Sequence, residues 1–320
     1  MKRLLFLILL GFTVPAMSHD VGVTAIEVTQ LSPSQYLLAS PEGLDLSPPI
    51  AQGGCQLDQP LALGQRFQYL CDGDKPLSLV LGWQTGGVLV HANWLDGRRQ
   101  QQLLLPEEGL FSLTLDPGSN TTFYQEIQNF IVLGFEHILE GIDHLLLVTG
   151  LFLLLKSIRA LVAAITSFTL AHSVTLVLSY LDWVALPMAP VEAAIALSIA
   201  ILAVEIVKDL NQRSGLASRY PALVAGAFGL LHGLGFASAL KELQVPDESR
   251  ISALLGFNLG VELGQLFFLA CLGVTLWIIK KGVALLLSSA QLTGLMHRTK
   301  WLAAYSMGSL AMFWTITRMV

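Results

Sequence analysis

Charged side chains are what this sequence lacks most. Only 13% of its 320 residues are Asp, Glu, Lys or Arg, whereas a soluble globular domain carries about 25%. Hydrophobic residues make up 53% of the chain, and the mean hydropathy is +0.63. This balance excludes an ordinary soluble enzyme and predicts a protein that crosses a lipid bilayer several times.

Several functional signatures are missing as well. The net charge is only −5, and the chain has no basic stripe, which excludes nucleic acid as a partner. No repeat with a period of about 20–50 residues is evident. The chain also has no nucleotide-binding motif.

The chain has only three cysteines, and the N-terminus suggests what two of them do. Lys2 and Arg3 precede an apolar run and a small-residue cleavage site, which predicts a signal peptide over residues 1–18. An uncleaved anchor is the alternative. Export to an oxidising compartment favours a disulfide between Cys55 and Cys71, which would contribute about 3 kcal/mol by loop entropy.

Residues 19–120 are predicted to form an extracytoplasmic β-rich domain. Short alternating or β-branched runs are separated by Gly, Pro and Asp turns, a spacing typical of a small antiparallel sandwich. The expected strands are Val21–Gln30, Arg66–Cys71, Leu77–Leu81, Val88–Trp94, Gln100–Leu105 and Leu110–Leu115. His91 stands alone here, and we expect it to be a surface or hydrogen-bonded histidine rather than a ligand.

The remainder is predicted to be a membrane all-α bundle. A lead-in helix over 121–136 is followed by a transmembrane domain over 137–320. Apolar runs of about 20 residues predict six spans, at 137–155, 160–181, 187–207, 221–240, 252–279 and 300–318. The segment 282–296 is expected to be a short amphipathic element or a seventh span.

The distribution of Lys and Arg predicts the orientation of these spans. If the N-terminal domain is exported, nine cations lie in the inner loops and three in the outer connections and the C-terminus. This bias agrees with the positive-inside rule. We therefore expect a bacterial-type inner membrane protein whose N-terminal domain lies on the periplasmic side.

Ionisable residues are concentrated between Gly134 and Gly150, just before and within an apolar run. The segment contains Glu136, His137, Glu140, Asp143 and His144. If it is one helix, His137, Glu140 and His144 share a stripe. Charged groups in a span usually face a bundle interior or a water-filled cavity, so the pattern predicts a divalent metal site. The alternative is an interfacial helix end whose charges lie in water.

Further polar side chains lie inside the later spans. His172 and His232 occur in the second and fourth spans, and Asn258 and Glu262 share a stripe in the fifth. No matching set of Lys or Arg is present to pair with these groups. Imidazoles and carboxylates gathered in one bundle therefore favour a cation or protons as the ligand.

At these residues the sequence resembles the HupE/UreJ family of hydrogenase- and urease-accessory membrane proteins, which are regarded as nickel or nickel–cobalt permeases. The resemblance covers about residues 130–280. It is carried by His137-x5-Asp143-His144, Ala171–Leu176, Glu192–Ser198, Phe228–Ala237 and Phe257–Gln265. The exported domain resembles the longer branch of the family. The resemblance implies lipid, a metal ion and metalloenzyme maturation proteins as partners.

We therefore expect a non-enzymatic permease for a divalent transition metal, with Ni²⁺ first and Co, Cu or Zn as alternatives. The expected ligands are His137, Asp143 and His144, completed by His172, His232, Glu262, Glu140 and Asn258. Three other functions stay open. They are copper handling, with the mature N-terminal His19 as a ligand, a membrane-embedded metalloenzyme, and a metalloenzyme-assembly factor without transport.

Overall fold

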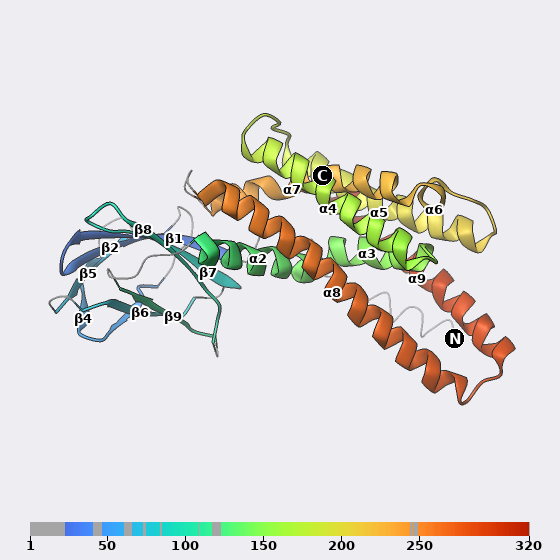
Figure 1. The fold of residues 1–320 in the computed structure, drawn as a ribbon, viewed down its shortest axis with the longest axis horizontal. Coiled ribbons are helices and arrows are strands. Elements are labelled where there is room, and N and C mark those ends of the chain that lie inside the picture. The colour runs from blue at the N-terminus through green and yellow to red at the C-terminus, as the bar shows by residue number, and fades with distance from the viewer. Residues whose placement is uncertain are drawn as a thin grey trace.

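The computed structural model describes residues 23–40, 47–60, 66–72, 75–83, 85–107, 109–116, 123–243, 245 and 249–319. The predicted signal peptide and His19 lie outside these residues. A β-rich domain over 23–115 precedes a helical region, which confirms the expected order of the two parts. In Figure 1 the β domain lies at the left, and the helices extend away from it to the right.

The β domain consists of two sheets. Its strands are β1 Val23–Ser32, β2 Gln35–Ala39, β3 Ile50–Gln52, β4 Cys55–Pro60, β5 Arg66–Cys71, β6 Leu77–Leu81, β7 Gly87–Asn93, β8 Arg99–Leu104 and β9 Phe111–Leu115. The larger sheet has the order β4-β5-β2-β1-β7-β8, and the smaller has the order β3-β6-β9. Buried residues of both sheets form one core, as expected for a sandwich.

The pairing of the larger sheet corrects the expectation of a purely antiparallel sandwich. β1 and β7 are parallel, with Val23 opposite Gly87 and Thr29 opposite Asn93. A parallel pair needs a long connection, and here the intervening chain, which contains β2–β6, provides it. The sequence prediction also missed β2, β3 and β4, which are short and lie among Pro and Gly turns.

Burial within the strands explains how the domain meets the helices. β6 and β9 alternate between buried and less buried positions, because only one face of their sheet meets the core. In β7 six consecutive residues are buried. Val88 and Val90 face the core of the sandwich, whereas Leu89 joins an apolar cluster with helix residues. β7 is therefore covered on both faces.

Cys55 and Cys71 form a disulfide between β4 and β5, where they are directly opposed. The bridge closes a separation of 16 residues. By loop entropy, such a bridge stabilises a domain by about 3 kcal/mol. It ties the edge strand β4 to the sheet, so that the edge stays paired.

The helical region contains eight described helices. They are α2 Phe123–Glu140, α3 Ile142–Leu154, α4 Ile158–Tyr180, α5 Met188–Leu210, α6 Leu216–Arg219, α7 Pro221–Glu242, α8 Arg250–Ala284 and α9 Ser289–Thr317. Among the described residues, α4, α5 and α8 are long and apolar enough to cross a membrane. The pair α2 and α3, bent by 74°, would make a fourth span. The count of six spans stays a prediction.

Two helix boundaries differ from those predicted. The lead-in helix does not end near 136, because α2 continues to Glu140 and the chain breaks at Gly141, inside the predicted first span. The segment 282–296 is not a separate element either. Its first residues end α8, and its last residues begin α9 at Ser289, whose N-cap Ser288 accepts a hydrogen bond from the Gln291 amide.

Glycines let two pairs of helices approach closely. A Cβ at Gly134 in α2 would overlap the backbone carbonyl of Phe257 in α8. A Cβ at Gly233 in α7 would overlap the carbonyl of His172 in α4. Small residues at helix crossings are typical of membrane bundles, where close van der Waals packing drives association. These two crossings hold α8 against α2 and α7 against α4.

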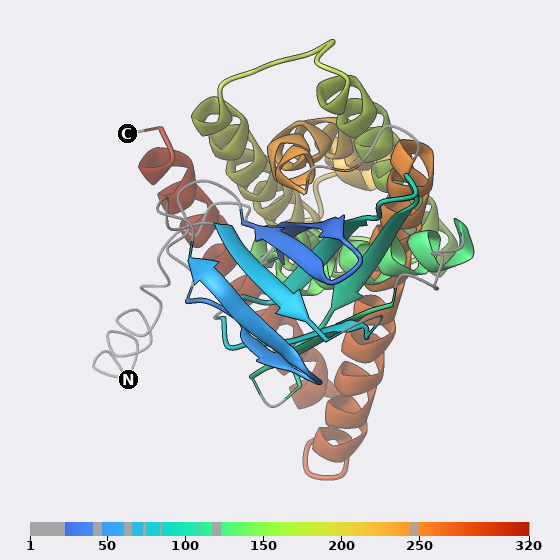
Figure 2. The ribbon, with the colours of Figure 1, turned by 90° about the vertical axis from the view of Figure 1, so that its left-hand side faces the viewer.

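The β domain contacts the helices through an apolar cluster and one histidine. Ala25 and Leu89 of the larger sheet pack with Phe130 of α2 and with Leu243. His91 is buried, and its Nε2 lies 2.8 Å from the Leu243 carbonyl oxygen, while its Nδ1 lies 3.1 Å from Gln101 Nε2. Figure 2, in which the β domain faces the viewer, shows its strands in front of the helices.

We expect this contact to weaken as the pH falls. Burial lowers the pKa of His91 from its ordinary value of 6.5, although the Leu243 carbonyl and Glu27 act in the opposite direction. A histidine released from the contact therefore binds a proton more readily than the buried one. The stabilisation is complete above pH 6.5 and is lost as the pH falls through the lowered pKa.

Hydrogen exchange of residues 87–93 at pH 7.5 and pH 5.5 measures this effect. After correction for the slower intrinsic exchange of amides at the lower pH, the parent should be less protected at pH 5.5 than at pH 7.5. His91→Gln, which keeps a side-chain donor but does not titrate, should lose most of the difference. An equal pH response in the two proteins would contradict the role of His91.

Candidate metal centre

Three buried histidines from three helices come together. His137 of α2, His144 of α3 and His172 of α4 each offer one ring nitrogen, and these nitrogens lie within 4.8 Å of one another. The three residues are 5%, 2% and 1% exposed. Imidazole is a good ligand for Zn, Cu, Fe and Ni. The donor set therefore suits a divalent transition metal.

The break at Gly141 produces this arrangement. Gly141 has an extended backbone, with φ −74° and ψ 93°, and α3 starts at the next residue. A Cβ on Gly141 would lie only 2.5 Å from His144 Nδ1 and 2.9 Å from the His137 carbonyl oxygen. The rings of His137 and His144 lie 4.7 Å apart, centre to centre. The bend thus brings together two rings that one continuous helix would carry two turns apart.

This geometry corrects the interpretation of Gly134–Gly150 as one helical stripe. His137 and Glu140 belong to α2, and His144 belongs to α3, across a bend of 74°. Glu140, the last residue of α2, is exposed and is not one of the three clustered residues. A glycine inside an apolar, charge-containing run was the available signal for the break.

His232 of α7 lies beside the cluster. Its ring centre is 5.1 Å from that of His144, and the residue is 2% exposed. Its Nδ1 lies 2.9 Å from the Phe228 carbonyl oxygen. A carbonyl can only accept, so Nδ1 carries the proton and Nε2 of the neutral ring keeps its lone pair. Such a hydrogen bond to the second nitrogen is usual for histidines that bind metals.

Three phenylalanines enclose the histidines. Phe236 lies 4.1 Å from the ring centre of His137 and stacks on Phe257 at 4.5 Å. Phe168 lies 5.1 Å from the ring centre of His232. All three phenylalanines are largely or fully buried. The apolar wall limits the access of water and fixes the ring orientations. None of the three phenylalanines was among the expected site residues.

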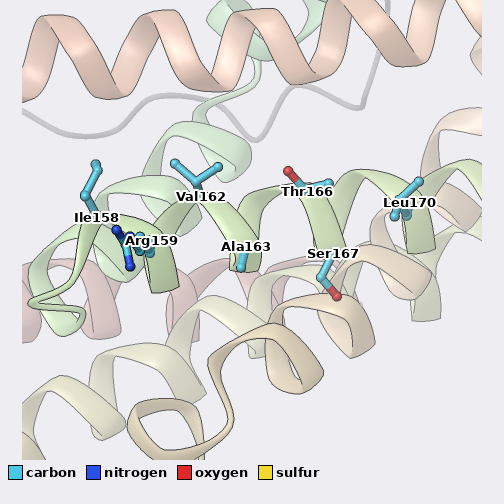
Figure 3. A pocket seen from close by; sticks show the side chains of 7 residues that line it. All are labelled: Ile158, Arg159, Val162, Ala163, Thr166, Ser167 and Leu170. Atoms are coloured by element: carbon cyan, nitrogen blue, oxygen red, sulfur yellow. The ribbon is translucent and has the colours of Figure 1, made fainter.

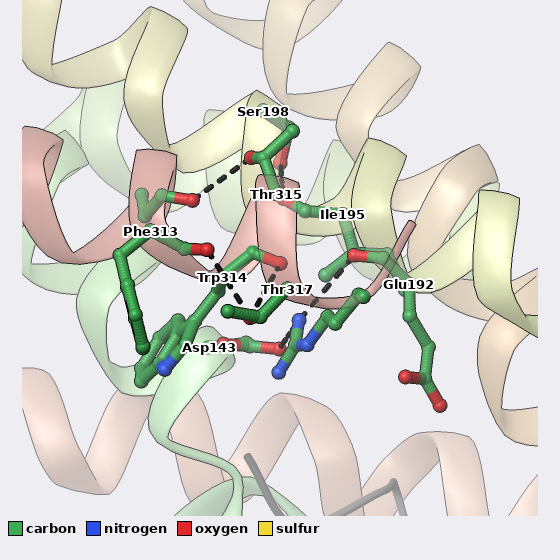
Figure 4. A network of polar contacts seen from close by, with 10 residues as sticks. Asp143, Glu192, Ile195, Ser198, Phe313, Trp314, Thr315 and Thr317 are labelled. Carbon is green, nitrogen blue, oxygen red and sulfur yellow. Dashed lines mark hydrogen bonds and ion pairs between the residues drawn. The ribbon is translucent and has the colours of Figure 1, made fainter. Parts of the chain in front are cut away.

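Asp143, an expected primary ligand, forms an ion pair with a residue at the far end of the chain. Its carboxylate lies 2.8 Å from Nη1 of Arg318, the C-cap residue of α9. The same guanidinium nitrogen donates to the Glu192 carbonyl oxygen of α5 at 3.3 Å. Figure 4 shows Asp143 and Glu192 in this network. Arg318 is one of the three cations expected on the outer side, and no sequence pattern predicted its ion pair with Asp143.

Glu262 and Asn258 lie in a polar row between α4 and α8. Thr166 donates to Glu262 Oε1 at 2.6 Å, and Thr169 donates to Gln265 Oε1 at 3.2 Å. Asn258 Nδ2 bonds its own helix at the Leu254 carbonyl, 2.7 Å away. The residues Thr166, Thr169 and His172 follow one another at a spacing of three along α4. The row thus begins one turn from the histidine cluster.

A groove of about 650 Å³ runs along the same part of α4 (Figure 3). Its lining consists of Ile158, Arg159, Val162, Ala163, Thr166, Ser167 and Leu170. Thr166 both lines the groove and donates to Glu262. Ser167 donates to the Ala222 carbonyl of α7 at 2.7 Å. The groove therefore adjoins the polar row, two turns along α4 from His172.

Comparison with known proteins gives a match to a family model that covers the helical part of the chain. No curated protein and no solved structure matches the chain. The family model described as HupE / UreJ protein matches residues 117–318, which include every described helix and the whole histidine cluster. Because the match covers well over half of the sequence, the chain belongs to the HupE/UreJ family.

Proposed function

We propose that this protein is a permease that carries a divalent transition metal ion, nickel or cobalt first, across the inner membrane. The observation that supports it best is the set of three histidine nitrogens within 4.8 Å on three helices. The family is linked to nickel and cobalt handling, and its members are accessory proteins or permeases rather than enzymes. The metal ion is cargo in this proposal.

The donor chemistry favours a transition metal over Mg²⁺ or Ca²⁺. Those hard cations prefer oxygen ligands, whereas His137, His144 and His172 offer nitrogen. Metal–imidazole bonds are about 2.0–2.1 Å long for zinc, so small ring rotations bring the three nitrogens into range. His232, with its proton held on Nδ1, would supply a fourth nitrogen. Because the three or four histidine ligands are neutral, they do not cancel the positive charge of the bound ion. The remaining charge helps the release of the ion.

The path away from the cluster follows the polar row on α4 and α8. Gln265 and Thr169 are buried, and Glu262 is half-buried beside the groove. A carboxylate there would attract a cation that has left the histidines. The ion would then pass from nitrogen ligands to the oxygens of Gln265 and Glu262. On this route Glu262 takes part in the movement of the metal. Asn258, one turn earlier on α8, supports Glu262 in this role.

Replacing Glu262 tests the path separately from the binding site. In Glu262→Gln we expect bound metal to stay close to that of the parent. Uptake should fall by about tenfold, because the transfer barrier would rise by about 1.4 kcal/mol. Leu263→Ala, an exposed neighbour, is the control. Equal loss of binding and uptake in Glu262→Gln would instead place Glu262 among the ligands.

The proposed orientation has the β domain on the periplasmic side. In a background that lacks Cys271, single cysteines replace Ala185, between α4 and α5, and Ser214, between α5 and α6. Both positions are exposed. An impermeant thiol reagent should label position 185 in intact cells and position 214 only after permeabilisation. The reverse pattern would invert the topology.

Metal analysis of the purified protein, together with uptake by membranes at matched protein levels, tests the function itself. We expect about one nickel or cobalt ion for each chain and uptake that requires the protein. Copper binding in place of nickel would favour copper handling. Binding without uptake would favour a metalloenzyme-assembly factor. Absence of bound metal would overturn the proposal.

A further inference from the structure

We propose that Arg318 is a positioning residue for the metal centre and that it acts through Asp143. The ion pair between them fixes the first turn of α3, and this turn directs His144 toward His137 and His172. Asp143 is then an anchor and not a ligand. The positioning itself can be tested without metal, whereas its effect on affinity rests on the proposed function.

The ion pair is short and buried. Arg318 Nη1 lies 2.8 Å from Asp143 Oδ2, and the two side chains are 8% and 3% exposed. The guanidinium also donates to the Glu192 carbonyl and lies over the ring of Trp314, 5.3 Å from its centre. Arg318 therefore joins α3, α5 and α9 at one point. A guanidinium held on several sides in this way has little freedom to move.

The ion pair lies in the first turn of α3. The N-cap of α3 is Gly141, so no side chain caps the helix, and α2 ends at the bend. Asp143 and His144 are adjacent, so their side chains leave the helix about 100° apart. One side chain is held by α9 and the other faces the histidines of α2 and α4. The ion pair thereby sets the rotation of the turn that carries His144.

The opposing hypothesis is that Asp143 binds the metal. If so, removal of Arg318 frees a carboxylate beside the centre, and affinity should stay or rise. If Asp143 is an anchor, Arg318→Ala and Asp143→Asn should weaken affinity to a similar extent. The double variant should then lose little more than either single variant, because both remove one interaction. Loss of such a supporting contact typically costs about 10–100-fold in metal affinity.

Two measurements on the full chain separate the effects. The first is labelling of His144 by diethylpyrocarbonate without metal, read by peptide mass spectrometry. In the parent, His144 should be protected, because it is 2% exposed. In Arg318→Ala, labelling should rise severalfold. Arg318→Lys, and the charge exchange Asp143→Arg with Arg318→Asp, should restore much of the protection. Arg298→Ala, at an exposed position of α9, is the control.

The second measurement is titration with Ni²⁺ and Co²⁺, using the visible spectrum of bound Co²⁺. Arg318→Ala should weaken affinity by about 10–100-fold and change the spectrum as His144 leaves the ion. Protection of His144 in every variant would overturn the positioning role. So would unchanged or higher affinity in Arg318→Ala. If the parent binds no metal but the labelling changes as described, the proposed function fails and the positioning role stands.

Discussion

Replacement of His172 by alanine is expected to abolish tight metal binding and uptake. His172 brings α4 to the cluster and is 1% exposed. Complete structural zinc sites are worth about 10–16 kcal/mol, which is about 2.5–5 kcal/mol for each ligand of a three- or four-ligand site. Loss of one ligand should therefore weaken binding by about 100-fold or more. Isothermal titration with Ni²⁺, and uptake at matched protein levels, measure the two effects.

Two further variants separate ligand loss from damage to the fold. His172→Gln keeps a polar side chain of similar size and should bind metal as poorly as His172→Ala. Val174→Ala changes an exposed residue of the same helix and should behave like the parent. If both His172 variants bind and transport like the parent while folding normally, the cluster is not the metal site, and its histidines are structural.

Gly141→Ala should also impair the site strongly, although it removes no ligand. The new Cβ would lie 2.5 Å from His144 Nδ1 and 2.9 Å from the His137 carbonyl oxygen, closer than van der Waals contact. Alanine also favours a continuous helix over glycine by about 1 kcal/mol. Both effects turn the His144 ring away from its neighbours. We expect affinity for Ni²⁺ to fall by about 10–100-fold.

The matched control is Gly273→Ala in α8. There a new Cβ would meet only the Phe152 ring, 3.9 Å away, at an ordinary contact distance. Thermal unfolding should distinguish loss of the site from loss of the fold, since Gly141→Ala should keep a cooperative transition. If Gly141→Ala retains the affinity of the parent, the ring positions at the bend do not control binding.

Local properties of the sequence were enough for part of this description. The scarcity of charge and the apolar runs predicted a helical membrane region, and alternating strands separated by turns predicted the β domain before it. The histidines were found because imidazoles inside apolar runs are costly and therefore rare. The family resemblance was carried by motifs that the family model also covers.

Contacts between distant segments required the tertiary structure. The parallel pairing of β1 with β7 depends on chain topology, and the burial of His91 depends on docking of the β domain against Leu243. Neither contact leaves a periodic pattern in the sequence. Hydrophobic periodicity indicates which face of a segment is buried, but it does not indicate which segment covers that face.

By itself, the sequence determined that the chain has an N-terminal β-rich domain and a helical membrane region, and which histidines are available to a metal. Only the tertiary structure decided which of them meet. A helix fixes neighbours at spacings of three and four, and this rule predicted a stripe of His137, Glu140 and His144. The rule does not apply across the backbone break at Gly141. The third member of the cluster is His172 of α4 and not Glu140. Likewise, Asp143 has a guanidinium from 175 residues further along the chain as its partner, because helix packing, and not sequence spacing, brings the two charges together.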